Sequence, residues 1–203
     1  MTYDPLISRG VSSMLPAANS YWHATHKPPT LPPLNKKVNT EYLVIGGGYT
    51  GLSAAITLAQ AKQEVTLLDA NSPGFGCAGR NGGFILSGSG RLSLSAIEDK
   101  WGRDIAKAMQ GEFDGAVHLL KQRIADFDMQ VDLVEGPYLK LAHNPQQAEL
   151  LCASAKHLES HFNVPSSPLS EKDLIARFGI EGAYGGVELK GACLHPLKLV
   201  SEY

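Results

Sequence analysis

The stretch "EYLVIGGGYTGLSAAITLAQAKQEVTLLDA", Glu41 to Ala70, decides the fold expected for this chain. Its start, "EYLVI", is a short apolar run typical of a buried parallel strand. After the glycines, "TGLSAAITLAQAK" predicts a helix, because apolar residues recur on one face at Leu52, Ala55, Ile56 and Ala59. "EVTLLDA" then predicts a second strand that ends at Asp69. Together they predict a βαβ unit with a right-handed crossover.

The glycine spacing in this unit, called here the glycine turn (residues 46–51), is typical of dinucleotide binding. Gly46 permits a tight turn, Gly48 lets a pyrophosphate approach the main chain, and Gly51 lets the helix pack close to the strand. The anion is then expected at the helix N-terminus, beside Tyr49 and Thr50, where N–H groups and the helix dipole favour negative charge.

An acid follows the second strand at the expected place. Asp69 lies 18 residues after Gly51, and Ala70 comes next. The Asp69 carboxylate is expected to accept hydrogen bonds from the ribose of an adenosine. An acid here disfavours a 2′-phosphate and therefore NADP, but it does not distinguish FAD from NAD.

A second glycine cluster, "GFGCAGRNGG", Gly74 to Gly83, follows directly and is called here the glycine-rich loop. Its N–H groups are suited to a nest for phosphate or the adjoining sugar chain. Arg80 is suited to offset pyrophosphate charge, and Asn81 either to bond ribityl hydroxyls or to orient the loop. A mobile surface loop with a solvated arginine is the alternative, and the residues alone leave both open.

Three motifs together carry a family resemblance: "SYWHAT", "VIGGGYTGLSAAITLA" and "GFGCAGRNGG". They resemble the FAD-dependent D-amino-acid oxidase superfamily and, within it, the gamma-glutamylputrescine oxidase type. The likeness runs from about Ser20 to the end and includes "GACLHPLKL", Gly191 to Leu199. The pairing of a GGGYTG turn with a GRNGG loop is what makes the resemblance specific.

The resemblance implies a Rossmann-like α/β FAD-binding domain of the glutathione-reductase-like type (GR2), followed by part of an α+β substrate domain. It implies that the glycine turn holds FAD pyrophosphate and that Asp69 holds the ribose. The glycine-rich loop would supply residues along the cofactor toward the flavin: Arg80, Asn81, Gly82 and Gly83. Two positions depart from the family: Cys77-Ala78 replaces the usual alanine-serine, and Asp69 replaces the usual glutamate.

We expect four regions along the chain: an N-terminal arm (1–40), the FAD-binding βαβ unit with the GRNGG loop (41–92), the first part of the substrate domain (93–168), and a return toward the FAD domain (169–203). Proteins of this type are about twice as long, so the chain is expected to be the front portion of an oxidase. We expect it to show no turnover by itself.

Helical spacing predicts helices through Phe113–Phe127 and Leu151–Phe162, and a short helix between the N-cap Ser170 and Gly179. The final segment "PLKLVSEY" is also expected to be helical. "VDLVEGPYLKLA" predicts two strands around Gly136-Pro137. In the arm, "KPPTLPPLNKK" favours extended geometry without helix or sheet, and the adjacent Tyr21-Trp22 pair predicts that the arm docks.

Composition excludes several classes of partner. The net charge is −2, with 43% hydrophobic and 19% charged residues, so neither nucleic acid nor an acidic membrane surface is expected as a partner. The uncharged run from Tyr42 to Ala59 is better explained by strand, turn and helix than by a membrane span. "MTYDPLISRG" has no secretion-signal pattern, and three widely spaced cysteines form neither a disulfide framework nor a zinc motif, which favours a cytoplasmic location.

Four further residues invite a functional interpretation, and a structural role is favoured for each. Cys77 is expected to be a small residue in a tight loop rather than a redox thiol, and His195 a turn residue rather than a base. Tyr138 and Tyr184 are expected to pack in the core rather than line a substrate cavity. No histidine–carboxylate cluster has metal-ligand spacing.

The expected function is therefore an FAD-dependent oxidoreductase that oxidises the CH–NH bond of an amine or amino acid to an imine, with oxygen as the acceptor. The gamma-glutamylated amine class follows from the resemblance alone. The alternatives are an NAD-dependent dehydrogenase and a nucleotide-binding fragment without turnover. The sequence identifies no catalytic acid or base and does not predict an oligomeric state.

Overall fold

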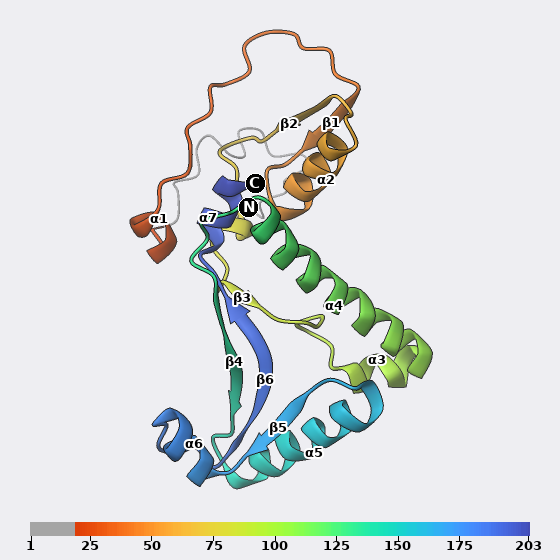
Figure 1. Cartoon of the computed structure of the whole chain (residues 1–203), viewed down its shortest axis with the longest axis vertical. Helices are drawn as coiled ribbons and strands as arrows, with labels where there is room; N and C mark the ends of the chain where they lie inside the picture. The colour runs from red at the N-terminus through yellow and green to blue at the C-terminus, as the bar shows by residue number, and fades with distance from the viewer. Residues whose placement is uncertain (1–18) are drawn as a thin grey trace, which may run out of the picture. The chain divides into compact units, whose positions relative to one another are not determined.

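The structure is a computed structural model that describes residues 19–203, so the sequence expectations for residues 1–18 lie outside it. The chain divides into two compact units. Of the described residues, unit 1 holds 19–83 together with Met129–Asp132 and Leu194–Tyr203. Unit 2 holds Phe84–Asp128 and Leu133–Cys193. Each unit is described by itself below (Figure 1).

Unit 1 contains the predicted βαβ element. Strand β1 (Tyr42–Ile45) leads through the glycine turn into helix α2 (Tyr49–Gln60), and strand β2 (Val65–Leu68) follows. The two strands pair in parallel, in a register that sets Tyr42 beside Val65 and Ile45 beside Leu68. The strand–helix–strand prediction is confirmed.

The predicted burial of β1 is wrong. Leu43 is 53% exposed and Ile45 is 82% exposed. A parallel strand is buried only where helices or further strands cover both faces of its sheet. In the described part of the chain this sheet has two strands, and α2 is the helix that packs on them, so part of β1 stays open.

The segments around the βαβ element complete unit 1. Helix α1 (Tyr21–Thr25) precedes a stretch without helix or strand from residue 26 to 41, as the prolines of the arm predict. A single 3₁₀ turn, η1 (Cys77–Gly79), lies in the glycine-rich loop, and helix α7 (Pro196–Glu202) confirms the predicted final helix. The short helix α1 was not predicted.

Unit 2 is built on an antiparallel sheet whose central strand is β6 (Gly186–Cys193). Strand β4 (Val134–Leu141) pairs along its whole length with β6, while β3 (Phe84–Ile85) and β5 (Ser166–Leu169) also pair with β6. The prediction of two strands around Gly136-Pro137 is wrong, because β4 runs through both residues. Among the described strands β4 pairs with β6 alone, and an edge strand tolerates a proline that cannot donate a ladder hydrogen bond.

Four helices accompany this sheet: α3 (Leu94–Trp101), α4 (Arg103–Asp126), α5 (Pro145–Phe162) and α6 (Glu171–Phe178). Helical spacing predicted α4 and α5, capping residues predicted α6, and α3 was missed. Helix α6 begins at Ser170 in a capping box with Asp173 and ends at Gly179 in the left-handed conformation, as predicted. Leu94, Ile97, Ala106 and Phe162 form one buried cluster, and Leu169, Leu174 and Ala183 form another.

Within residues 19–203, no helix combines the length and apolar character needed to cross a membrane.

Candidate functional site

The glycine turn needs glycine at its first and third positions for different reasons. Gly46 has a φ of 107°, which side-chain-bearing residues rarely adopt, and its N–H donates to the carbonyl of Leu68 at 2.7 Å. A Cβ atom on Gly51 would collide with the carbonyl oxygen of Gly46. The first turn of α2 can therefore approach the end of β1 only without a side chain at residue 51.

The middle glycine, Gly48, borders open space. A Cβ atom placed on it would have no atom within 4 Å, and its φ of −87° is ordinary. Gly48 is also the N-cap of α2, with no side chain capping the helix, and the first intrahelical bond runs from Leu52 N–H to Gly48 O. The N–H groups of Tyr49, Thr50 and Gly51 precede that bond, so they have no acceptor within the helix. They form an uncapped, electropositive helix end beside open space.

Asp69 braces the glycine turn from the end of β2. Its Oδ2 accepts the N–H of Gly47 at 2.6 Å, and its Oδ1 accepts the N–H of Asn71 at 2.8 Å. A carboxylate has about four lone-pair positions, so each oxygen keeps capacity for a further donor. Gly47 was not predicted as a site residue, although it is the central residue of the run "GGG" at 46–48. A Cβ atom on Gly47 would lie only 3.0 Å from Pro73 and 3.3 Å from Asp69.

The structure brings the two glycine clusters together. The N–H of Gly74, the first residue of the glycine-rich loop, donates to the carbonyl of Gly47 at 2.9 Å. Gly74 has a φ of 75°, and a Cβ atom on it would press into Val200 of α7 at 2.9 Å. A Cβ atom on Gly79 would meet both the Gly74 carbonyl and Leu197 of α7. The loop is thus fixed between the glycine turn and α7, which excludes the interpretation of a loose surface segment at these contacts.

Asn81 holds the shape of the glycine-rich loop. Its side-chain N–H₂ donates to the carbonyls of Ala78 at 2.9 Å and Cys77 at 3.2 Å, and its Oδ1 accepts the N–H of Gly83 at 2.8 Å. Both ends of the amide are therefore used within the loop. Of the two roles considered for Asn81, the structure shows the orienting one.

Arg80 is exposed at the rim of the loop. Its Nε–H donates to the carbonyl of Gly76 at 3.1 Å, and the guanidinium carbon lies 5.8 Å from the centroid of the Phe75 ring. These contacts orient the guanidinium but involve no carboxylate, so its positive charge is available to an anion near the loop.

Tyr49 ties the start of α2 to α7. Its hydroxyl donates to the carbonyl of Pro196 at 3.0 Å, and burial raises the pKa of this phenol above its usual 10.0. The Asn81 amide also approaches the same hydroxyl at 3.5 Å. The hydroxyl of Tyr49 is thus occupied by protein groups, while its main-chain N–H faces the open helix end.

His195 is buried and caps the N-terminus of helix α7, and both of its ring nitrogens are hydrogen-bonded within the protein. Its Nδ1 accepts the N–H of Lys198 at the start of α7, and its Nε2 lies 3.0 Å from the hydroxyl of Thr25. That hydroxyl donates its own hydrogen to the carbonyl of Tyr21 at 2.8 Å, so it accepts from His195. These bonds require the neutral ring with hydrogen on Nε2. Burial lowers the pKa of His195, as do His26 and Lys198, while Asp132 acts in the opposite direction.

This environment predicts a pH-dependent stability. Because the folded state depresses the pKa of His195, the unfolded chain binds its proton first, near the ordinary value of 6.5. The contribution of His195 to the free energy of unfolding is therefore complete above pH 6.5. It is lost as the pH falls from 6.5 toward the pKa of the folded state. An NMR titration should place the imidazole transition below 6.5, and denaturant unfolding should show stability rising with pH over that window. A His195 transition at or above 6.5 would contradict the assignment.

The remaining predicted site residues have simpler positions. Thr50, Ala70 and Gly82 are exposed. Gly83 is buried with a φ of 75°, and its carbonyl accepts the N–H of Leu194 at 2.9 Å.

Three other residues considered from the sequence were expected to have structural roles. Cys77 is exposed and unpaired as a thiol. Tyr138 is half-buried with its ring 5.7 Å from that of Phe84. The expectation that Tyr184 packs in the core is wrong, because it is 54% exposed where its N–H pairs with Ala142 just before β6. Among residues 19–203 no group of three or more histidine, cysteine, aspartate or glutamate side chains could hold a metal ion.

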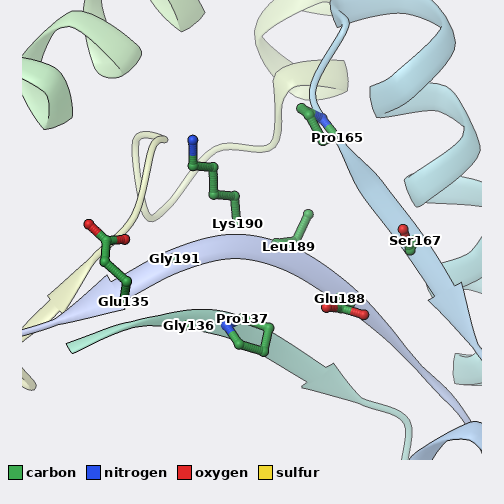
Figure 2. Close-up of a pocket in the computed structure, with 9 residues that line it drawn as sticks. All are labelled: Glu135, Gly136, Pro137, Pro165, Ser167, Glu188, Leu189, Lys190 and Gly191. Carbon is green, nitrogen blue, oxygen red and sulfur yellow. The ribbon is translucent and has the colours of Figure 1, made fainter. Parts of the chain in front are cut away.

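Unit 2 has a separate cavity of about 340 Å³ over its sheet (Figure 2). Figure 2 shows Glu135 and Lys190 rising from neighbouring strands. Glu135 pairs with Lys121 of α4 at 2.7 Å, and Glu188 pairs with Arg177 of α6 at 2.6 Å. Both acids are therefore neutralised within unit 2. The lining residues, none of which was predicted as a site residue, are Glu135, Gly136, Pro137, Pro165, Ser167, Glu188, Leu189, Lys190 and Gly191.

Comparison with known proteins identifies the family. The sequence profile of the family described as "FAD dependent oxidoreductase" (DAO) matches residues 41–203. The gamma-glutamylputrescine oxidoreductase of Escherichia coli K12 is 32% identical over 168 residues, which are 82% of this chain and 39% of that protein. The chain thus spans about two fifths of the length of this relative.

Solved structures show the same fold. The glycine oxidase of Geobacillus kaustophilus superimposes with a TM-score of 0.61 at 17% identity, over 80% of this chain and 42% of that one. The FAD-bound L-alpha-glycerophosphate oxidase of Mycoplasma pneumoniae gives a TM-score of 0.57 at 16% identity, over 79% and 40%. The Rossmann-like α/β fold of this family is thereby confirmed. Since the family profile covers well over half of the sequence, the chain belongs to the FAD dependent oxidoreductase family.

Proposed function

We propose that unit 1 binds FAD at the glycine turn, as part of an oxidoreductase that acts on the CH–NH bond of an amine or amino acid. The observation that carries the proposal is the hydrogen bond from Gly74 N–H to Gly47 O, which joins both glycine clusters beside the uncapped start of α2. A turn that only connects a strand to a helix does not require a second glycine-rich segment beside it. A site for a diphosphate with an attached sugar chain does, because the ligand extends past the first segment and needs main-chain N–H groups along its length.

The residues present fit FAD. Open space lies at the Cβ position of Gly48, where a pyrophosphate would approach the main chain. The N–H groups of Tyr49, Thr50 and Gly51 would donate to it, and Arg80 would add a positive charge. Asp69, already held by Gly47 and Asn71, would accept the ribose hydroxyls with its remaining lone pairs. Ala70 would border the adenosine, and Asn81, Gly82 and Gly83 would form the wall toward the flavin.

When bound, FAD supplies the two-electron acceptor for substrate oxidation. The chain's own residues bind and orient the cofactor, and none of them is assigned as a catalytic acid or base. Unit 2 is proposed as the first part of the substrate domain. The name of the gamma-glutamylputrescine oxidoreductase relative supports a gamma-glutamylated amine as the substrate class. Oxygen as the acceptor stays a prediction from the sequence. A cytoplasmic location remains a prediction from composition.

The rival functions are separated by two measurements. Purified protein should carry a flavin absorption band, and flavin-free protein should quench the fluorescence of added FAD while binding NAD at least a hundredfold more weakly, about 3 kcal/mol. Colourless protein that binds NAD tightly would favour the dehydrogenase. Peroxide release is then assayed with gamma-glutamylated amines, amino acids and N-methylated amino acids. Because this chain by itself is expected to show no turnover, release of peroxide with any of them would overturn that expectation and exclude the nucleotide-binding fragment.

A further inference from the structure

Helix α1 contacts the glycine-rich loop through one side chain. The indole Nε1–H of Trp22 donates to the main-chain carbonyl of Asn81 at 2.8 Å. The same indole packs edge-on against His195, with ring centroids 4.8 Å apart. Trp22 therefore bridges the loop and the start of α7.

Two more residues at the end of α1 fasten it to α7. The Thr25 hydroxyl accepts from His195 Nε2 at 3.0 Å, as described above. His26 Nε2 lies 2.9 Å from the hydroxyl of Ser201, which donates its own hydrogen to the Leu197 carbonyl and so accepts from His26. Each hydroxyl thus has one donor and one acceptor contact, and the His195 ring must be neutral because its Nδ1 also accepts the N–H of Lys198.

The chain connection does not explain why α1 sits there. Residues 26–41, which lead from α1 to β1, contain neither helix nor strand, and most of them are exposed. Figure 1 shows this segment as a long loop between α1 and β1. A long connection without helix or strand would allow α1 to occupy many positions. The observed position of α1 must therefore be fixed by the contacts that α1 itself makes.

Asn81 is the residue on which these contacts converge. Its side chain bonds three main-chain groups of the loop, at Cys77, Ala78 and Gly83. Its carbonyl is held by Trp22. The loop conformation is thus fixed from inside by the Asn81 amide and from outside by α1.

We propose that α1 is a clasp that positions the glycine-rich loop for FAD, with Trp22 as its positioning residue. The role of α1 in FAD binding rests on the function proposed above. That α1 holds the conformation of the loop does not rest on that function, and the mobility of the loop can be measured without cofactor. Without the Trp22 bond, the Asn81 peptide is freer to rotate, and part of the FAD binding energy must then order the loop.

The test compares Trp22→Phe with Tyr21→Phe. The first keeps an aromatic ring and removes the N–H donor. The second is a matched control, because Tyr21 is the neighbouring aromatic of the same helix and is 69% exposed. For both variants, amide hydrogen exchange across residues 74–83 is measured in flavin-free protein, and the FAD dissociation constant is measured by flavin fluorescence. Thermal unfolding checks that each variant is folded.

Trp22→Phe is expected to accelerate exchange in the loop and to weaken FAD binding, each about five- to tenfold, while Tyr21→Phe leaves both unchanged. Unchanged exchange in folded Trp22→Phe would overturn the clasp. Faster exchange with an unchanged FAD dissociation constant would overturn its positioning role. If the unsubstituted protein binds no FAD but Trp22→Phe still loosens the loop, the proposed function fails while the clasp stands.

Discussion

Gly48→Val should abolish FAD retention while the protein stays folded. The main chain at Gly48 has φ −87° and ψ 177°, which valine adopts without strain, and its Cβ would meet no atom within 4 Å. The stability change should therefore stay within about 1 kcal/mol, the scale of an N-cap substitution. The added side chain would instead occupy the space where the pyrophosphate is proposed to bind. We expect the FAD dissociation constant to rise at least a hundredfold, about 3 kcal/mol.

The measurement combines flavin content after gel filtration with denaturant unfolding. Gly48→Ala serves as a graded control, because a single methyl group should weaken binding less than valine. A Gly48→Val protein that retains its full flavin content would show that the cofactor does not lie at this turn.

Gly51→Ala should have the opposite signature, a loss of folding rather than a selective loss of cofactor. Here the new methyl group would collide with the main-chain oxygen of Gly46 and would lie 3.2 Å from Val44 Cγ1. Main chain cannot move aside as a flexible side chain can, so α2 would have to shift away from β1. We expect a cost of about 3 kcal/mol or more, the upper range for overpacking, which is a large part of the stability of a small unit.

Urea unfolding followed by circular dichroism would measure this cost. Gly115→Ala is the matched control, because Gly115 lies inside α4 and its Cβ position is empty. That substitution should be neutral or stabilising by up to about 1 kcal/mol, since alanine favours a helix over glycine. Equal stabilities for Gly51→Ala and the unsubstituted protein would show that the close approach of α2 to the turn is not required.

The sequence alone was sufficient for the elements that are encoded locally. The βαβ order follows from apolar runs of strand and helix period around Gly46 to Gly51, and α6 follows from its N-cap Ser170 and terminal Gly179. In each case the decisive interactions join residues a few positions apart. The glycine spacing likewise predicted two positions that need a bare main chain, and the structure supplies the reason: a positive φ at Gly46 and a steric clash at Gly51.

Tertiary structure alone decided how distant segments use those elements. No local pattern shows that Asp69 braces Gly47, that Asn81 is bonded by Trp22 from 59 positions away, or that His195 caps α7 against Thr25. For Ile45 the sequence failed: its apolar run predicted burial, but within residues 19–203 its sheet has no further strand to cover it. Local propensity depends on adjacent residues. Burial and hydrogen-bond partners depend instead on which remote segments pack against an element. Short-range periodicity does not contain that information.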